Sequence, residues 1–178
     1  MTKTLILHLK PADPARCDKY LYGTHLATEK GQLVFDNPCI APGKALLSWH
    51  SKRHYQAHRV CPDLPLLIPG DSYELTYQVQ VLSGGACYLQ VSFKNQQDEL
   101  LEVLTLRDQQ GLFTCPVGTD HYDISLMSAG CHQLRFQELK LYACEAQKVW
   151  QEAPKAKSYQ EQDLPAELDL ICSLIPLA

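Results

Sequence analysis

The sequence has little of what marks a membrane-spanning or nucleic-acid-binding chain. None of its apolar runs approaches the roughly 18 to 20 residues that a membrane-spanning helix needs. Its formal net charge of −4 offers no basic surface to a nucleic-acid backbone or an anionic membrane. The apolar run near the N-terminus is interrupted by His8 and Lys10, which predicts a strand there and not a secretory signal. We therefore expect a cytoplasmic protein that is not an integral membrane protein and binds no nucleic acid.

The eight cysteines are scattered along the sequence. None of them forms a CxxC pair, and a chain of 178 residues can bury a core without disulfides. Cys87 falls on the apolar side of an alternating segment, where a thiol packs as a small hydrophobe. The sequence therefore favours reduced, structural cysteines over a disulfide framework.

Catalytic motifs are also missing from the sequence. It contains no G-x-S-x-G motif, and no helix start follows Gly84-Gly85 as a phosphate-binding loop requires. His50, His54 and His58 recur every four residues, but the residues around them are cationic and include no carboxylate. We expect no enzyme activity, no cofactor and no metal site. The enzyme alternative is a metal-dependent hydrolase that uses these three histidines.

What the sequence does contain is regular alternation of apolar and polar residues. It is clearest from Ser72 to Lys94, where two alternating segments flank Gly84-Gly85. A period of two places the apolar side chains on one face of a strand. A glycine pair supplies the positive φ angles of a tight reversal. The pattern predicts an antiparallel hairpin with one buried face, which a second sheet must cover.

Other predicted strands, about nine or ten in all, follow one another at roughly ten-residue spacing, with turn residues between them. The predicted strands include residues 4–9, 32–36, 44–51, 99–107, 112–117, 122–127 and 133–142. Short strands at this spacing are typical of a β-sandwich or barrel. We predict an all-β fold, an antiparallel β-sandwich of the jelly-roll type, in a domain of residues 1–145.

The composition changes near residue 146. Residues 147–162 are polar and indicate a linker, whereas apolar residues beyond Leu164 recur near helical spacing. We predict a polar linker and an amphipathic C-terminal tail over residues 146–178, with a helix as one possible form of the tail. Leu168, Ile171 and Ile175 are its candidate partner contacts. Docking on a partner and simple packing or disorder of the terminus both stay open.

Aromatic side chains beside polar ones point to a contact surface. Flat rings that are flanked by hydrogen-bonding groups suit sugar rings. The candidate contacts for a glycan or a preprotein are Trp49, Tyr55, Arg59 and Tyr88. The competing interpretation places the aromatic residues in the core, because aromatics supply most of the buried area in small β proteins.

Six short motifs, taken together, resemble a known family. They are Tyr20-Leu21-Tyr22-Gly23, Ser48-Trp49-His50-Ser51, Tyr55-Gln56-Ala57-His58-Arg59, Leu64-Pro65-Leu66, Gly70-Asp71-Ser72-Tyr73-Glu74-Leu75 and Gly111-Leu112-Phe113-Thr114-Cys115-Pro116. In order and spacing, between Tyr20 and Tyr142, the sequence resembles the smallest of the three Asp subunits of the accessory Sec system of Gram-positive bacteria.

This resemblance implies a non-enzymatic β-sandwich similar to carbohydrate-binding modules. It implies cytoplasmic assembly with the two larger Asp subunits, one resembling a glycosyltransferase and the other an acetyltransferase. It also implies contact with serine-rich repeat adhesin preproteins. Contact with the accessory SecA motor would be direct or through the other subunits, and the secretion complex would place the chain peripherally at the membrane. The chain departs from the family pattern in its cysteine and histidine content and beyond Cys144. The alternative function is a stand-alone carbohydrate-binding module.

Overall fold

The computed structural model of the protein describes residues 2–10, 17–53 and 61–145, and their regular structure is entirely β. The strands are β1 (Thr2–Leu9), β2 (Asp18–Lys19), β3 (His25–Glu29), β4 (Gln32–Asp36), β5 (Ala45–His50), β6 (Ser72–Lys94), β7 (Leu100–Leu106), β8 (Gln110–Thr114) and β9 (His121–Glu145). Every strand pair is antiparallel, so the predicted all-β antiparallel fold is confirmed. In these ranges no helix is long and apolar enough to span a membrane. The predicted linker and tail lie outside the described residues.

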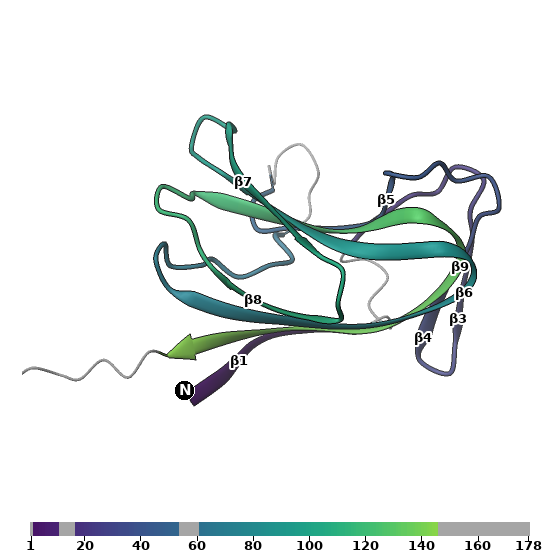
Figure 1. The fold of residues 1–178 in the computed structure, drawn as a ribbon, viewed down its shortest axis with the longest axis horizontal. Coiled ribbons are helices and arrows are strands. Elements are labelled where there is room, and N and C mark those ends of the chain that lie inside the picture. The colour runs from purple at the N-terminus through teal and green to yellow at the C-terminus, as the bar shows by residue number, and fades with distance from the viewer. Residues whose placement is uncertain (1, 11–16, 54–60, 146–178) are drawn as a thin grey trace, which may run out of the picture. The chain divides into compact units, whose positions relative to one another are not determined.

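Two long strands organise the sheet. β6 and β9 pair along their lengths, from Ser72 opposite Cys144 to Lys94 opposite His121. Figure 1 shows them running together and curving over at the same end. The prediction of a hairpin over residues 72–94 is therefore wrong, because this segment is one bent strand. The two strands predicted within residues 122–142 are likewise parts of one strand, β9.

Glycines explain why both strands bend where a reversal was predicted. Gly84 and Gly130 have φ angles of +91° and +87°, and Gly84 lies opposite Cys131 in the β6–β9 register. A Cβ atom on Gly84 would lie 2.6 Å from the carbonyl oxygen of Gly130, and one on Gly85 would lie 2.5 Å from that of Ala129. The absence of side chains lets the two backbones approach closely at one shared bend.

We expect the Gly84→Ala substitution to destabilise the protein by about 1–3 kcal/mol, since it combines a strained φ angle with a backbone clash. Urea denaturation followed by circular dichroism measures the loss. Gly130→Ala is the matched control: it has a similar φ angle, but its Cβ would meet nothing within 4 Å. Equal losses in the two variants would contradict the close-approach explanation.

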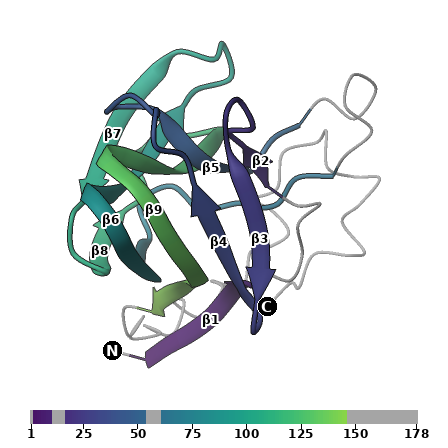
Figure 2. The same ribbon diagram turned by 90° about the vertical axis from the view of Figure 1, so that its right-hand side faces the viewer.

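The bend folds the sheet into two layers, seen one above the other in Figure 1. In the first layer, residues 86–94 of β6 and 121–128 of β9 are flanked by β7 on one side and by β5 and β2 on the other. In the second layer, residues 72–84 of β6 and 131–145 of β9 are flanked by β8 and by β1, β4 and β3. Figure 2 shows β9 between β6 and β4, with β3 at the edge.

The core lies between the two layers, and aromatic contacts across it join one layer to the other. The ring centroids of Trp49 in β5 and Phe136 in β9 are 5.5 Å apart. Those of Phe93 in β6 and Phe113 in β8 are 5.8 Å apart. Each pair contains one residue from each layer, and all four side chains are buried. The buried apolar residues of the two layers therefore form a single cluster.

The shorter strands agree with the predicted positions to different degrees. β4 has the predicted bounds, and β7 lies inside the predicted range 99–107. β8 begins two residues before the predicted range 112–117. β3 was not predicted; Lys30 and Gly31, with φ angles of +50° and +77°, form its tight turn into β4. A Lys-Gly pair is a weaker turn signal than Asn-Gly, which is why this hairpin escaped prediction.

Candidate functional site

The outward face of the first layer carries a row of polar residues across five strands. Residues directly opposite one another on paired strands share a face of the sheet. Following these partners from β2 to β7 gives the row Asp18, Ser48, Ser125, Gln90 and Thr105. The Oγ atoms of Ser48 and Ser125 lie 2.9 Å apart within the row. This face therefore presents hydroxyl, amide and carboxylate groups side by side.

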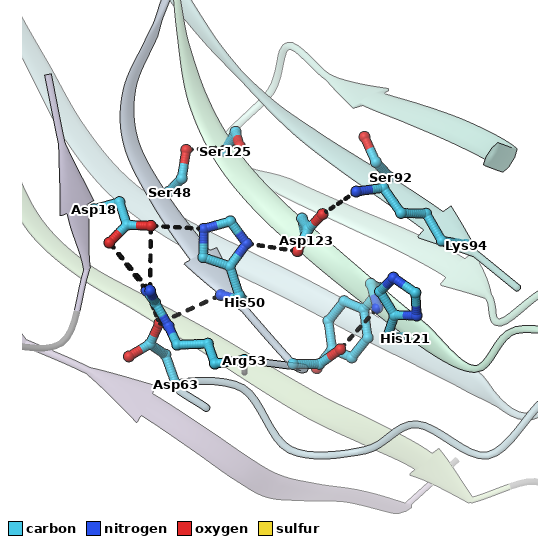
Figure 3. A network of polar contacts seen from close by, with 12 residues as sticks. Asp18, Ser48, His50, Arg53, Asp63, Ser92, Lys94, His121, Asp123 and Ser125 are labelled. Carbon is cyan, nitrogen blue, oxygen red and sulfur yellow. Dashed lines mark hydrogen bonds and ion pairs between the residues drawn. The ribbon is translucent and has the colours of Figure 1, made fainter. Parts of the chain in front are cut away.

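His50 lies beside this row and is held between two carboxylates (Figure 3). Its Nδ1 atom is 2.6 Å from Oδ1 of Asp123, and its Nε2 atom is 3.0 Å from Oδ2 of Asp18. The hydrogen bond to Asp123 raises the pKa of His50 against the opposing effect of partial burial. Because carboxylates only accept hydrogen bonds, both ring nitrogens donate when the imidazole is protonated. An imidazolium that donates on both sides does not serve as a general base for a neighbouring serine.

The same network extends to Lys94 on β6. The Nζ atom of Lys94 lies 2.8 Å from Oδ2 of Asp123, so this carboxylate accepts bonds from two cations. Burial opposes ionisation of Asp123, but the bonds from His50 and Lys94 prevail and lower its pKa. The carboxylate thus stays ionised while His50 titrates.

These shifts predict a pH-dependent stability. A folded-state pKa of His50 above its ordinary value of about 6.5 stabilises the fold fully below that value. The contribution is lost as the pH rises through the raised pKa of His50. We expect the free energy of unfolding of the wild type to decrease over this pH range because of His50. The free energy of unfolding of His50→Gln should lack this decrease. Urea denaturation at pH values from about 6 to about 9 measures both, and parallel profiles would contradict the assignment.

Arg53 and Asp63 form a buried ion pair next to His50. Nη2 and Nε of Arg53 are 2.8 Å and 3.2 Å from Oδ2 of Asp63, whose side chain is 1% exposed. The guanidinium also reaches Asp18, with Nη1 3.2 Å from Oδ1. The backbone N–H of His50 donates to Asp63 at 3.3 Å. This pair connects the end of β5 to the segment that begins at residue 61.

The metal-site alternative finds no support in the part of the chain that the structure describes. His50 is the one histidine of the predicted triple in this part, and its two ring nitrogens face Asp123 and Asp18. Among residues 2–10, 17–53 and 61–145, no group of three His, Cys, Asp or Glu side chains is placed to hold a metal ion. His54 and His58 lie outside the described residues.

The predicted contact residues have different outcomes. Trp49 is 3% exposed and packs on Phe136, so its prediction as a surface contact is wrong. Because successive side chains of a strand point to opposite faces, Trp49 lies on the opposite face of β5 from Ser48 and His50. Tyr88 is half-buried in β6 and shares the outward face with Gln90, two residues along, and it stays a prediction. The other predicted contacts lie outside the described residues: Tyr55, Arg59, Leu168, Ile171 and Ile175.

A second surface was missed by the sequence reasoning. Among the residues that the structure describes, β7 and β8 each pair only with β6, so each layer ends on this side in an edge strand. Seven of the eleven large hydrophobic side chains that are exposed in the described ranges lie on these strands, on the loop after β8 or on the segment before β6, whose residues Gly70 and Asp71 bond to Cys115 at the end of β8. We call this surface the open edge; its residues are Leu66, Ile68, Leu100, Leu101, Val103, Leu112 and Val117. The available signal was that β7, Leu-Leu-Glu-Val-Leu-Thr-Leu, is apolar on both faces.

A cleft of about 460 Å³ opens between the two edge strands. Leu104 of β7 and Phe113 of β8 line it, together with Phe93 and Val117. Glu102 is the one charged residue in the lining. Exposed apolar side chains gathered beside a cleft are typical of sites that bind another protein or an apolar ligand.

A cleft of different character lies on the second layer. It has a volume of about 440 Å³ and is lined by residues of β6, β8 and β9, among them Gln78, Gln110, Lys140 and Tyr142. Glu138 in this lining accepts hydrogen bonds from His8 at 2.8 Å and from Lys140 at 2.5 Å. An aromatic ring beside amide and charged groups can contact a hydroxyl-rich ligand.

Comparison with known proteins connects this fold to one family. The family model described as "Accessory Sec secretory system ASP3" matches residues 19–143. The chain belongs to this family of accessory Sec proteins. It is 32% identical to the family's accessory Sec system protein from Streptococcus gordonii over 123 residues, which are 68% of this chain and 77% of that protein.

Two solved structures have folds similar to that of this chain. A crystal structure of accessory secretory protein 1, 2 and 3 in Streptococcus pneumoniae contains a chain with 28% identity and a TM-score of 0.66, covering 71% of this chain and 90% of that one. The tandem CBM22-1–CBM22-2 domain of Paenibacillus barcinonensis Xyn10C has a TM-score of 0.51 at 12% identity and covers 88% of this chain and 48% of that one. The second likeness shows the fold alone and confirms the predicted similarity to carbohydrate-binding modules.

Proposed function

We propose that this member of the family is a non-catalytic subunit of an accessory Sec complex that assists export of serine-rich repeat adhesins. It binds the two larger Asp subunits and the preprotein, and it meets the accessory SecA motor directly or through the other subunits. The assembly works in the cytoplasm and at the membrane surface.

The open edge is the observation that carries the proposal. A chain that presents seven exposed large hydrophobic side chains beside an apolar cleft gains stability when a partner covers them. The relative from Streptococcus pneumoniae, of which this chain covers 90%, was solved together with accessory secretory proteins 1 and 2. This supports the larger Asp subunits as the partners of the open edge.

The polar row of the first layer is the proposed contact for the preprotein. Its hydroxyl and amide groups match the hydrogen-bonding capacity of a serine-rich or glycosylated chain. Tyr88 offers a ring next to this row, and Tyr55 and Arg59 stay candidate contacts. The proposal includes assistance with glycan modification of the preprotein, because a preprotein that carries glycans would contact this surface.

Capture of the preprotein tests this function. The tagged full chain is co-expressed with the two larger Asp subunits and with a serine-rich repeat fragment, and the bound fragment is quantified after purification. We expect the fragment to be retained by the complex, and the variant Tyr88→Ala/Gln90→Ala to retain less. Leu21→Ala, a substitution at an exposed loop residue, is the control. A complex that retains no fragment would contradict the proposed preprotein contact.

A stand-alone carbohydrate-binding module is the second candidate function. The polar cleft of the second layer, with Tyr142 beside Gln78 and Lys140, is the observation that favours it. A glycan array probed with the isolated full chain separates the two functions. Binding to free sugars that is lost in Tyr142→Ala would favour the module, whereas the complex subunit needs no such binding.

A further inference from the structure

β7 has one unpaired edge. It pairs with β6 from Leu100 opposite Lys94 to Leu106 opposite Leu89. Within the described ranges, no strand pairs with its other edge. The N–H and C=O groups on that edge form a ready template for one more antiparallel or parallel strand.

β7 carries few of the features that protect free edges; those present are Glu102 and a register shift with β6 between Phe93 and Lys94. Natural edge strands are blunted by lysine, proline or irregular backbone. The seven residues of β7 include neither lysine, arginine nor proline, and Leu100, Leu101 and Val103 are exposed. β3, the edge strand on the far side of the second layer, differs: it exposes His25, Thr28 and Glu29. Of these two edges, β7 is therefore the one that exposes large apolar side chains, and we regard it as better suited to an added strand.

The cleft beside β7 defines what an added strand would carry. Side chains that point inward from it would meet Leu104, Phe113 and Val117, which favours apolar residues at alternate positions. One inward position would face Glu102, the one charged residue of the lining, and this favours lysine or arginine. The partner segment is thus extended, alternately apolar, and basic at one point.

Charge distinguishes this partner from the two occupants that the chain itself could supply. The β7 strand of a second copy contains no lysine or arginine, and a parallel, in-register pairing would place Glu102 beside Glu102. The chain's own apolar tail, residues 163–178, contains acidic residues and no lysine or arginine. Neither β7 itself nor residues 163–178 therefore contain a lysine or arginine to face Glu102.

We propose that β7 is the docking strand for an extended segment of a larger accessory Sec subunit, which adds to the first layer as a new edge strand and faces Glu102 with a lysine or arginine. Strand addition of this kind takes affinity from main-chain hydrogen bonds and specificity from alternate side chains. The identity of the partner rests on the proposed function; the docking strand and its chemistry rest on the open edge.

The first test follows the backbone of the unmodified full chain. Amide hydrogen exchange is measured by mass spectrometry for the free chain and for its complex with the two larger subunits. We expect exchange in residues 100–106 to slow on complex formation, and exchange in β3 to stay unchanged. Complex formation without slower exchange in residues 100–106 overturns the docking strand and leaves the proposed function standing.

The second test places lysines on the edge. Leu101→Lys/Val103→Lys puts gatekeeper residues on two exposed positions, each 42% exposed, so the domain retains its fold by circular dichroism. We expect its affinity for the larger subunits to fall by about tenfold or more, as for the loss of a central interface contact. Glu102→Lys, which leaves every apolar side chain in place, should lower the affinity as well. The matched control is Leu21→Lys/Tyr22→Lys, an exposed apolar pair away from β7, with unchanged affinity.

The remaining outcomes are also decisive. Equal affinity of the wild type, the edge variants and the control overturns the docking strand. A free chain that is a dimer with protected β7 amides assigns the edge to a second copy and overturns the proposal. A wild-type chain that forms no complex with the larger subunits overturns the proposed function and the docking strand together.

Discussion

Replacing Trp49 with alanine is expected to destabilise the protein by about 3–5 kcal/mol, the range found for truncating a buried large aromatic side chain. Trp49 is 3% exposed, and its ring packs on Phe136 from the opposite layer. The substitution therefore leaves a cavity between the layers and removes one of the contacts that join them.

Urea denaturation followed by circular dichroism measures this loss. Trp49→Phe is the control, because it keeps an aromatic ring opposite Phe136 and should lose much less. Unchanged stability in Trp49→Ala, together with weaker binding of a preprotein or glycan, would return Trp49 to the surface role that the sequence suggested.

Replacing Arg53 with methionine is expected to cost a similar amount, about 3–5 kcal/mol, because it leaves the charge of Asp63 buried without its partner. The Asp63 side chain is 1% exposed and its Oδ2 atom accepts two bonds from the guanidinium. The backbone N–H of His50, at 3.3 Å, does not replace a cation.

A double-mutant cycle separates this loss from simple truncation. Asp63→Asn removes the buried charge, so Arg53→Met/Asp63→Asn should be more stable than Arg53→Met. Additive losses in the two single variants would show that the two side chains do not interact, and would contradict the buried ion pair.

The sequence allowed the fold class to be predicted because alternation depends only on neighbouring residues. β5 was predicted to within one residue at each end for this reason, whereas β4, a short apolar run, was predicted with its bounds because Asn37-Pro38 follows it. The prediction failed at Gly84-Gly85, since a glycine pair permits both a tight turn and a shared bend. What decides between them is the pairing of β6 with β9, which joins residues as far apart in the sequence as Ser72 and Cys144 and leaves no local signal.

The binding surfaces were less predictable than the fold. The alternation that correctly places Ser48 and His50 on one face also places Trp49 in the core, but aromatic chemistry suggested a platform there. The open edge depends on which strands end each layer, and this becomes visible only in the pairing, where β7 and β8 have β6 as their one partner within the described residues. Leu112 and Val117 look like ordinary strand residues in the sequence.

Size-exclusion chromatography with light scattering of the chain co-expressed with the two larger Asp subunits is the most direct test of the central claim. We expect one peak that contains all three chains in stoichiometric amounts, with the 20.1 kDa chain as its smallest component. A separate peak of 20.1 kDa, with the larger subunits eluting without it, would contradict the assignment of this chain as a subunit of the complex.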